Sequence, residues 1–278
     1  MFAIDLSYCA IKLKHAKALW LISLRFKVKH KVQQKQTLEL LMQLKSLIFD
    51  VDGTLADTED AHRMAFNDAF FAAKLGWNWD RALYKELLAV TGGKQRIRFF
   101  LEKTNDVALS RPDLDELIPA LHASKTDFFI NRLKGGQVPL RPGIEKLINE
   151  ARAQGMAISI ATTTTPINVE TLIRVNLGPD ALNWFDVIGD GGKVPILKPE
   201  PDVYNWVLKQ IGLEPGEALA LEDSKNGVVA AVRAKVPVLT VTNDYTLGQD
   251  FTGALAVLDT YEGLTLEKLK SLHGAAKS

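Results

Sequence analysis

A short apolar run that ends in acidic residues is the feature that most limits how this chain can fold. Residues 44–49 are mainly apolar, and Asp50-Val51-Asp52-Gly53-Thr54 follows directly. A run without regular solvent-facing positions is typical of a strand buried in a parallel sheet. Because such a sheet is covered by helices on both faces, the run predicts an α/β fold with further strands along the chain.

The pattern after this strand is helical. Apolar residues recur at helical spacing from residue 58 onward, with helices expected near 80–90, 94–103 and 113–134. No segment between residues 58 and 138 has the pattern of a strand. We therefore expect an α-helical insertion over 58–138.

Strands and helices alternate after residue 139. Strands are predicted at 157–161, 185–188, 218–221 and 236–241, with a helix between each pair. Connections of this length imply right-handed crossovers in a parallel sheet. The predicted fold is a doubly wound, Rossmann-like α/β core (residues 42–57 and 139–270), with an α-helical cap (58–138) inserted after the first strand.

Residues 1–41 differ from the rest in charge. They hold eight lysines and arginines against two acidic residues, a net charge of +6, while the whole chain has +1. A transit peptide, a membrane-surface helix and an over-extended reading frame or loose tail would each fit this segment. We expect a start at Met42 to give a complete domain.

Composition excludes several classes of protein. Hydrophobic residues make up 47% and charged residues 24%, as in an ordinary globular protein. The single cysteine, Cys9, indicates a reducing compartment. No apolar run approaches the roughly 18 residues that span a bilayer. We expect a monomer without a nucleic-acid partner, a core that does not bind membranes, and a cytoplasmic location, or the plastid stroma if residues 1–41 are a transit peptide.

Potentially catalytic side chains follow four of the predicted strands. Asp50 and Asp52 follow the first, Thr162 the second and Lys198 the third, and the fourth ends in Glu222-Asp223. Each alone fits a turn or a helix cap. Ligands of doubly wound sheets bind beyond the carboxyl ends of the strands, so these groups are expected to meet there.

Together these residue types predict phosphoryl transfer. Clustered carboxylates repel one another unless a cation lies among them, and an all-oxygen site suits Mg²⁺. A lysine and a hydroxyl can hold phosphoryl oxygens. One carboxylate can attack phosphorus, and a second can exchange protons with the leaving oxygen and with water.

The motifs resemble those of the haloacid dehalogenase-like hydrolases. The resemblance covers about residues 44–260 and rests on the segment 49–55, Thr162, Lys198-Pro199 and the segment 221–224. Segments 56–62, 91–94, 161–164 and 220–227 are most similar to the CbbY group. Those proteins are phosphatases of xylulose-1,5-bisphosphate, an inhibitor of Rubisco in the Calvin cycle.

The resemblance implies a role for each motif residue. Asp50 corresponds to the nucleophile and Asp52 to the general acid/base. Thr162 and Lys198 correspond to the phosphoryl-binding pair. The expected Mg²⁺ ligands are Asp50, the backbone carbonyl of Asp52, and Asp223, with Glu222 beside them. Dehalogenases of the superfamily lack the second aspartate, so dehalogenation is disfavoured.

Substrate selection is expected from the cap and the neighbouring strand end. Glu59 and His62 lie one helical turn apart, so they can face the cleft together. Lys94, Arg96 and Arg141 are cations that could bind an anion. The paired glycines Gly92-Gly93 could let backbone N–H groups approach sugar hydroxyls. A plain helix start and a capping turn are the alternatives at these positions. The predicted substrate-binding residues are Glu59, His62, Thr91, Gly92, Gly93, Lys94, Arg96, Arg141, Thr163 and Thr164.

The predicted function is hydrolysis of a phosphosugar, xylulose-1,5-bisphosphate, with Mg²⁺ as cofactor. A phosphosugar mutase of the β-phosphoglucomutase type would use the same four motifs. A non-catalytic protein that binds a partner, or a membrane through residues 1–41, is the alternative from another class.

Overall fold

The computed structural model describes residues 43–275. The interpretations of residues 1–41 and the expected start at Met42 therefore lie outside the described residues. None of the helices within 43–275 has the length and apolar character needed to cross a membrane.

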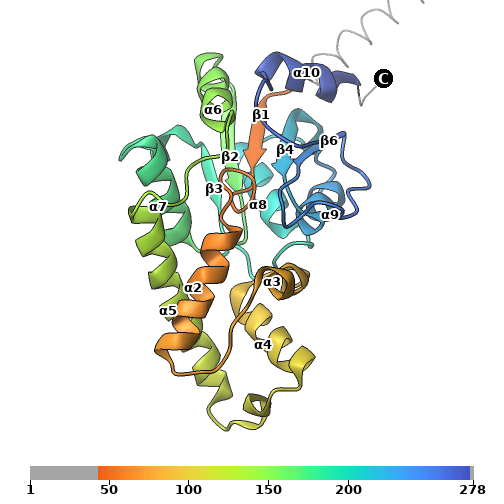
Figure 1. Ribbon diagram of the computed structural model, residues 1–278. Helices are drawn as coiled ribbons and strands as arrows, with labels where there is room; N and C mark the ends of the chain where they lie inside the picture. The colour runs from red at the N-terminus through yellow and green to blue at the C-terminus, as the bar shows by residue number, and fades with distance from the viewer. Residues whose placement is uncertain (1–42, 276–278) are drawn as a thin grey trace, which may run out of the picture. The chain divides into compact units, whose positions relative to one another are not determined.

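Six parallel strands form one sheet in the order β3-β2-β1-β4-β5-β6, so that the first strand lies in the middle (Figure 1). This arrangement confirms the predicted doubly wound core. The strands are β1 (Ser46–Phe49), β2 (Ala157–Ala161), β3 (Val187–Gly189), β4 (Ala218–Glu222), β5 (Val238–Val241) and β6 (Ala256–Leu258).

Two apolar clusters cover the two faces of the sheet. Leu47 and Phe49 of β1 pack into one cluster and Ile48 into the other, as the alternation of side chains along a strand requires. The first face is covered by α6 (Ile144–Ala153), α7 (Pro166–Leu177) and α10 (Leu266–Ala275), and the second by α8 (Asp202–Ile211) and α9 (Lys225–Arg233). Short 3₁₀ helices lie at Ala181–Trp184 and Pro215–Glu217.

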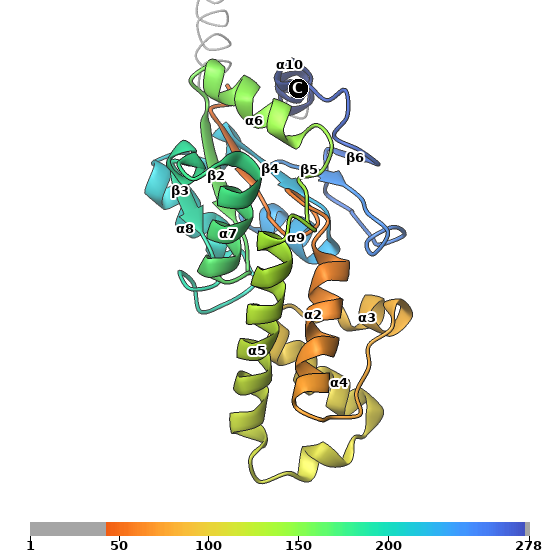
Figure 2. The same cartoon turned by 60° about the vertical axis from the view of Figure 1, so that its left-hand side comes forward.

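The cap, meaning the helices inserted between β1 and α6, has an apolar core of its own. Figure 2 shows its helices standing together beyond one edge of the sheet. Phe66, Phe70 and Trp79 lie at the centre of this third cluster. The cap contains α2 (Glu59–Ala72), α3 (Arg81–Leu87), α4 (Gly93–Thr104), a 3₁₀ helix (Val107–Ser110) and α5 (Leu114–Lys134).

The predicted elements agree with the structure to within about three residues at most ends. The last strand, β6, and the last helix, α10, were not predicted. β6 has three residues, all at least partly exposed, so it lacks the continuous apolar run that marks the other strands.

The register explains where functional groups gather. Phe49 pairs with Ile160 of β2 on one side and with Leu221 of β4 on the other. The residues that follow these three positions therefore lie side by side at one edge of the sheet, and the cap faces this edge.

Candidate active site

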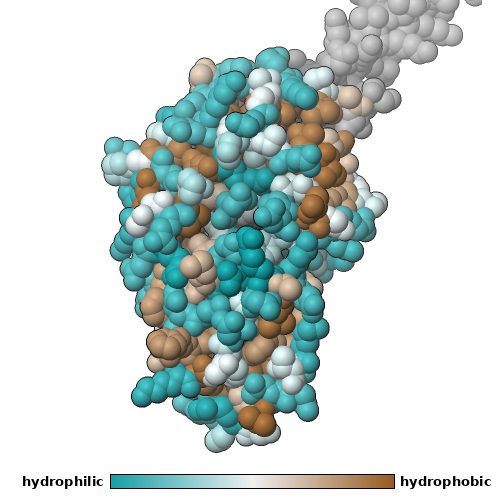
Figure 3. Space-filling model, in the orientation of Figure 1, coloured by the Kyte–Doolittle hydropathy of each residue, from teal (hydrophilic) through white to brown (hydrophobic). Residues whose placement is uncertain are grey.

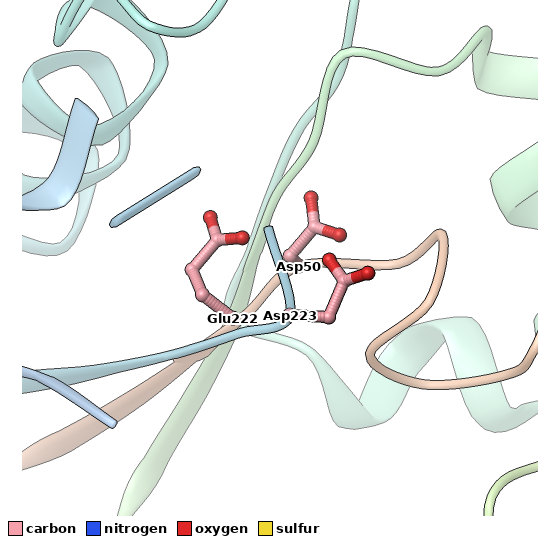
Figure 4. A group of neighbouring side chains, drawn as sticks. All are labelled: Asp50, Glu222 and Asp223. Carbon is pink, nitrogen blue, oxygen red and sulfur yellow. The ribbon is translucent and has the colours of Figure 1, made fainter. Parts of the chain in front are cut away.

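Three buried carboxylates meet at the carboxyl end of the two central strands. Asp50 follows β1, Glu222 ends β4 and Asp223 comes next. One carboxylate oxygen from each side chain lies within 4.8 Å of the other two. Figure 4 shows all three carboxylates on the same side of the sheet edge.

This carboxylate cluster fits a hard divalent cation. Burial raises the pKa of Asp50 and of Asp223, and the charge of Glu222 raises both further. Three carboxylates against the single ammonium of Lys198 leave two negative charges. Oε2 of Glu222 is buried and accepts no hydrogen bond from the described residues. An all-oxygen site of this charge suits Mg²⁺.

Lys198 lies between two of these carboxylates. Its Nζ lies 2.6 Å from Oδ1 of Asp50 and 2.7 Å from Oε1 of Glu222, and it donates to the Ala161 carbonyl at 2.8 Å. Burial alone would lower the pKa of Lys198, but the two carboxylates raise it above its ordinary value. The lysine is therefore charged at neutral pH.

Two further residues, Tyr204 and Gly227, determine the position of Glu222. The Tyr204 hydroxyl donates to the same Oε1 that contacts Lys198. Gly227 of α9 leaves room for the other oxygen, because a Cβ there would lie 1.8 Å from Oε2. A side chain at this position would displace the carboxylate, so glycine allows Glu222 to lie here.

Asp52 points into the same space and is held by the start of the cap. Its Oδ1 accepts a hydrogen bond from the Thr58 hydroxyl at 2.7 Å and lies 2.9 Å from Nε2 of His62. Nδ1 of His62 in turn lies 2.7 Å from Nζ of Lys125, on α5. A lysine ammonium can only donate, so His62 accepts at Nδ1 and donates from Nε2 to Asp52.

These contacts set the charges in the Lys125–His62–Asp52 series. Burial lowers the pKa of His62, as does the nearby Lys125. Burial also lowers the pKa of Lys125 to about 7. Burial would raise the pKa of Asp52, but the contacts with His62 and Thr58 bring it below its ordinary value. Asp52 is therefore ionised and His62 neutral at neutral pH.

A cavity of about 890 Å³ opens over these groups, between the sheet edge and the cap. Asp50, Asp52, Thr162, Lys198 and Asp223 line its core side. Glu222 lies behind them and is fully buried. Figure 3 shows hydrophilic side chains gathered across the middle of one face, between the core and the cap.

Comparison with known proteins identifies the family. The family model of the haloacid dehalogenase-like hydrolases matches residues 44–235. A CbbY protein from Cupriavidus necator is 46% identical over 215 residues, which is 77% of this chain and 85% of that protein. The chain belongs to the haloacid dehalogenase-like hydrolases.

Two solved structures of CbbY from Rhodobacter sphaeroides are similar to the chain. Both are 40% identical to it and cover 81% of this chain and 99% of their own. One is in complex with phosphate and has a TM-score of 0.74. The other is a variant in complex with xylulose-1,5-bisphosphate and has a TM-score of 0.75. The chain is thus an enzyme, a phosphatase of the CbbY type within its family.

Nearly all of the predicted substrate-binding residues of this hydrolase line the cavity. The cap contributes one wall and the strand end after β2 contributes the other. The predicted residues on these walls are Glu59, His62, Thr91, Gly92, Gly93, Lys94, Arg96, Thr163 and Thr164.

Hydrogen bonds hold part of the cap wall in place. The Tyr84 hydroxyl donates to Oε2 of Glu59 at 3.0 Å and accepts from the Arg96 guanidinium at 3.0 Å. Arg96 also donates to the Val90 carbonyl, but its Nε is buried without a partner among the described residues. Lys94 is exposed on the cavity wall.

Arg141, predicted as an anion-binding residue, lies outside this cavity and lines a smaller one of about 480 Å³. Its guanidinium is buried and donates to the backbone carbonyls of Gly53, Val241 and Thr242 at 2.6 to 3.0 Å. These donors are therefore committed to the backbone where the chain returns from the cap.

Several cavity residues were not predicted. Lys125 and His122 lie one turn apart on α5, and Asn168 lies on α7. The spacing of His122 and Lys125 is a signal that they share a helix face. That this face meets α2 follows only from tertiary packing.

The buried lysine generates a prediction about stability. Unfolded lysine titrates near 10.5, so between pH 7 and 10.5 the unfolded chain binds more protons than the folded one. The cost of burying Lys125 is therefore complete below pH 7 and declines as the pH rises. In Lys125→Met this cost is absent, so the rise in unfolding free energy between pH 7 and 10 should be smaller than in the wild type.

Urea denaturation at pH 6, 7, 8, 9 and 10 measures this difference. Lys134→Met removes an exposed lysine at the end of the same helix and should give the wild-type profile. Parallel profiles for Lys125→Met and the wild type would contradict the low pKa of Lys125.

Proposed function

We propose that this hydrolase is a Mg²⁺-dependent sugar-phosphate phosphatase that forms an aspartyl-phosphate and acts on xylulose-1,5-bisphosphate. One observation carries the proposal: Asp50 lies in a cavity between Lys198 and Asp223, and Asp52 faces the same space. The R. sphaeroides CbbY complex with this bisphosphate supports the choice of substrate.

Asp50 is proposed as the nucleophile. A carboxylate oxygen attacks phosphorus, the bond from phosphorus to the sugar oxygen breaks, and the phosphoryl group remains on Asp50. Lys198 contacts Asp50 and Thr162 lines the same cavity, so both would hold the transferred phosphoryl oxygens. Lys198 also favours the ionised form of Asp50, which is the form that attacks.

Asp52 is proposed to exchange protons in both halves of the reaction. It must first give a proton to the leaving sugar oxygen and then take one from the water that attacks the aspartyl-phosphate. In the substrate-free protein Asp52 is ionised, which is the form needed for the second half. The Lys125 ammonium can protonate Asp52 for the first half, because Nδ1 of His62 takes its proton while Nε2 of His62 gives one to Asp52.

Asp50, the backbone carbonyl of Asp52, and Asp223 are the proposed ligands of Mg²⁺, with Glu222 beside them. When bound, Mg²⁺ supplies positive charge that offsets repulsion between the carboxylates and the phosphoryl oxygens. The residues at the sheet edge would thus hold the cation, and Lys198 would hold the phosphoryl group against Asp50.

The insertion over residues 58–138 is proposed as the cap that selects the substrate. It brings Glu59, His62, Lys94 and Arg96 to the cavity. A cap over the reacting group limits access of bulk water. In this proposal Lys94 and Arg96 hold the phosphate that does not react, since Arg141 is committed elsewhere.

A phosphate-release screen over sugar monophosphates and bisphosphates tests the proposal. We expect the highest kcat/KM for xylulose-1,5-bisphosphate, loss of activity with a chelator and recovery when Mg²⁺ is added back. Conversion of a monophosphate into an isomer without free phosphate would indicate a phosphosugar mutase instead. No turnover of any sugar phosphate with Mg²⁺ would contradict the proposal.

The proposed nucleophile gives a direct prediction. Asp50→Asn should abolish phosphate release, because an amide oxygen does not form the covalent intermediate. The fold should persist, since the amide has nearly the same size. Phosphate release and circular dichroism measure the two outcomes, and retention of a few per cent of the wild-type rate would exclude Asp50 as nucleophile.

The proposed second phosphate site gives another prediction. Loss of a charge-assisted phosphate contact costs about 1.5–3 kcal/mol, or roughly 10- to 150-fold in kcat/KM. Lys94→Ala or Arg96→Ala should lower kcat/KM for the bisphosphate by about this factor. The decrease in kcat/KM for a monophosphate should be much smaller. Steady-state kinetics on both substrates provide the comparison.

Arg98→Ala is the matched control. Arg98 lies on the same helix, α4, is exposed, and pairs with Asp115 outside the cavity. Its kcat/KM should stay close to the wild type on both substrates. Equal losses on both substrates in Lys94→Ala and Arg96→Ala would rule out the second phosphate site.

A further inference from the structure

The loop after β5, residues 243–247, contacts both the carboxylate cluster and the cap, although it belongs to none of the four motifs. Asn243 organises this loop. Its Oδ1 accepts from the backbone N–H groups of Tyr245 and Thr246, at 2.9 and 3.1 Å. Its own N–H donates to the Thr246 hydroxyl at 3.1 Å. Three hydrogen bonds within four residues give the loop a defined shape.

The same side chain contacts a proposed metal ligand. Nδ2 of Asn243 donates to Oδ2 of Asp223 at 2.7 Å. The space around this bond is closed, because a Cβ on Gly53 would lie 2.1 Å from Oδ2 of Asp223 and 2.8 Å from Nδ2 of Asn243. A shift of the loop would therefore change the orientation of the Asp223 carboxylate.

Tyr245, two residues on, belongs to the apolar cluster of the cap. It is 7% exposed, and its ring packs edge-on against Tyr84 with centroids 5.8 Å apart. Its hydroxyl donates to Oδ1 of Asp60, on the first turn of α2, at 2.5 Å. Lys85 of α3 adds hydrogen bonds to the carbonyls of Asp244 and Leu247.

These cap contacts lie next to the cavity wall. Tyr84, the ring partner of Tyr245, is the residue whose hydroxyl holds Glu59. Asp60, the hydroxyl partner, directly follows Glu59 in α2. The loop thus touches the cap at the residues that place a cavity carboxylate, and it touches the core at Asp223.

We propose that the loop 243–247 couples the position of the cap to the orientation of Asp223, and that Tyr245 is the positioning residue on the cap side. This inference rests on the proposed function, because it takes Asp223 as a Mg²⁺ ligand. Coupling between two sites is reciprocal: seating the cap favours Mg²⁺ binding, and Mg²⁺ favours the seated cap.

Calorimetric titration of substrate-free protein with Mg²⁺ tests the coupling without any measurement of activity. Tyr245→Phe keeps the ring and removes only the hydroxyl bond to Asp60. We expect it to raise the Mg²⁺ dissociation constant about two- to fivefold, the order expected for one hydrogen bond. If this variant does not fold, Asp60→Asn weakens the same bond from the cap side, together with the ion pairs of Asp60 with Arg63 and Arg81.

A double-mutant cycle tests the route through Asn243. Asn243→Ala removes the bond to Asp223, so adding Tyr245→Phe to it should change the Mg²⁺ dissociation constant no further. Equal effects of Tyr245→Phe in both backgrounds would overturn the proposal. So would a dissociation constant for Tyr245→Phe within experimental error of the wild type.

Asn226→Ala is the control for loss of a cap–core contact alone. Nδ2 of Asn226 donates to the Thr91 hydroxyl and the Ala89 carbonyl, and no bond joins it to Asp223 among the described residues. Its Mg²⁺ dissociation constant should match the wild type. If Asn226→Ala raised the Mg²⁺ dissociation constant as much as Tyr245→Phe, general loosening of the cap rather than the loop would control Mg²⁺ binding. That result would overturn the proposal.

Hydrogen exchange of α3 supplies the reciprocal measurement. Mg²⁺ should slow amide exchange over Arg81–Leu87 in the wild type and have no such effect in Asn243→Ala. An equal effect in both proteins would contradict the coupling. Failure of the wild type to bind Mg²⁺ at all would refute the proposed function itself, so the two failures are distinguishable.

Discussion

The contact of Lys198 with Asp50 and Glu222 is the interaction on which the active site depends. Carboxylates as buried as these are costly to keep ionised, and the cost rises when they lie together. Lys198 offsets part of this cost through its contacts with Asp50 and Glu222. The lysine comes from the loop after β3, whereas the two carboxylates lie at the ends of β1 and β4. The remaining negative charge suits a divalent cation. The carboxylates of the site are therefore stabilised by Lys198 and by the cation that they would bind.

The part of the site around Asp52 depends on the cap as well as on the core. Asp52 belongs to the core, but its partners Thr58 and His62 belong to the chain that enters the cap, and Lys125 belongs to the helix that leaves it. The proposed proton chemistry therefore requires core and cap together, whereas the side chains of the carboxylate cluster all come from the core.

The core side of this site could be predicted from sequence because parallel strands leave their carboxyl ends at one edge. Once five strands were recognised, Asp50, Thr162 and Glu222 had to be neighbours. The position of Arg141 could not be predicted in this way, because the sequence does not show that its guanidinium donates to three backbone carbonyls. Lys125 was missed because its position against His62 depends on how α5 packs on α2. Tyr245 follows a core strand, yet it packs into the cap cluster, which is a purely tertiary relation.

The division of the cavity has a consequence for how such enzymes diversify. The cap residues that line the cavity, from Glu59 to Lys125, come from one uninterrupted stretch of chain that leaves the core once and returns once. The residues at the sheet edge come from separate segments on either side of it. Replacement of this single segment could therefore change which substrate fits the cavity, while the strands that carry the carboxylates and Lys198 stay the same.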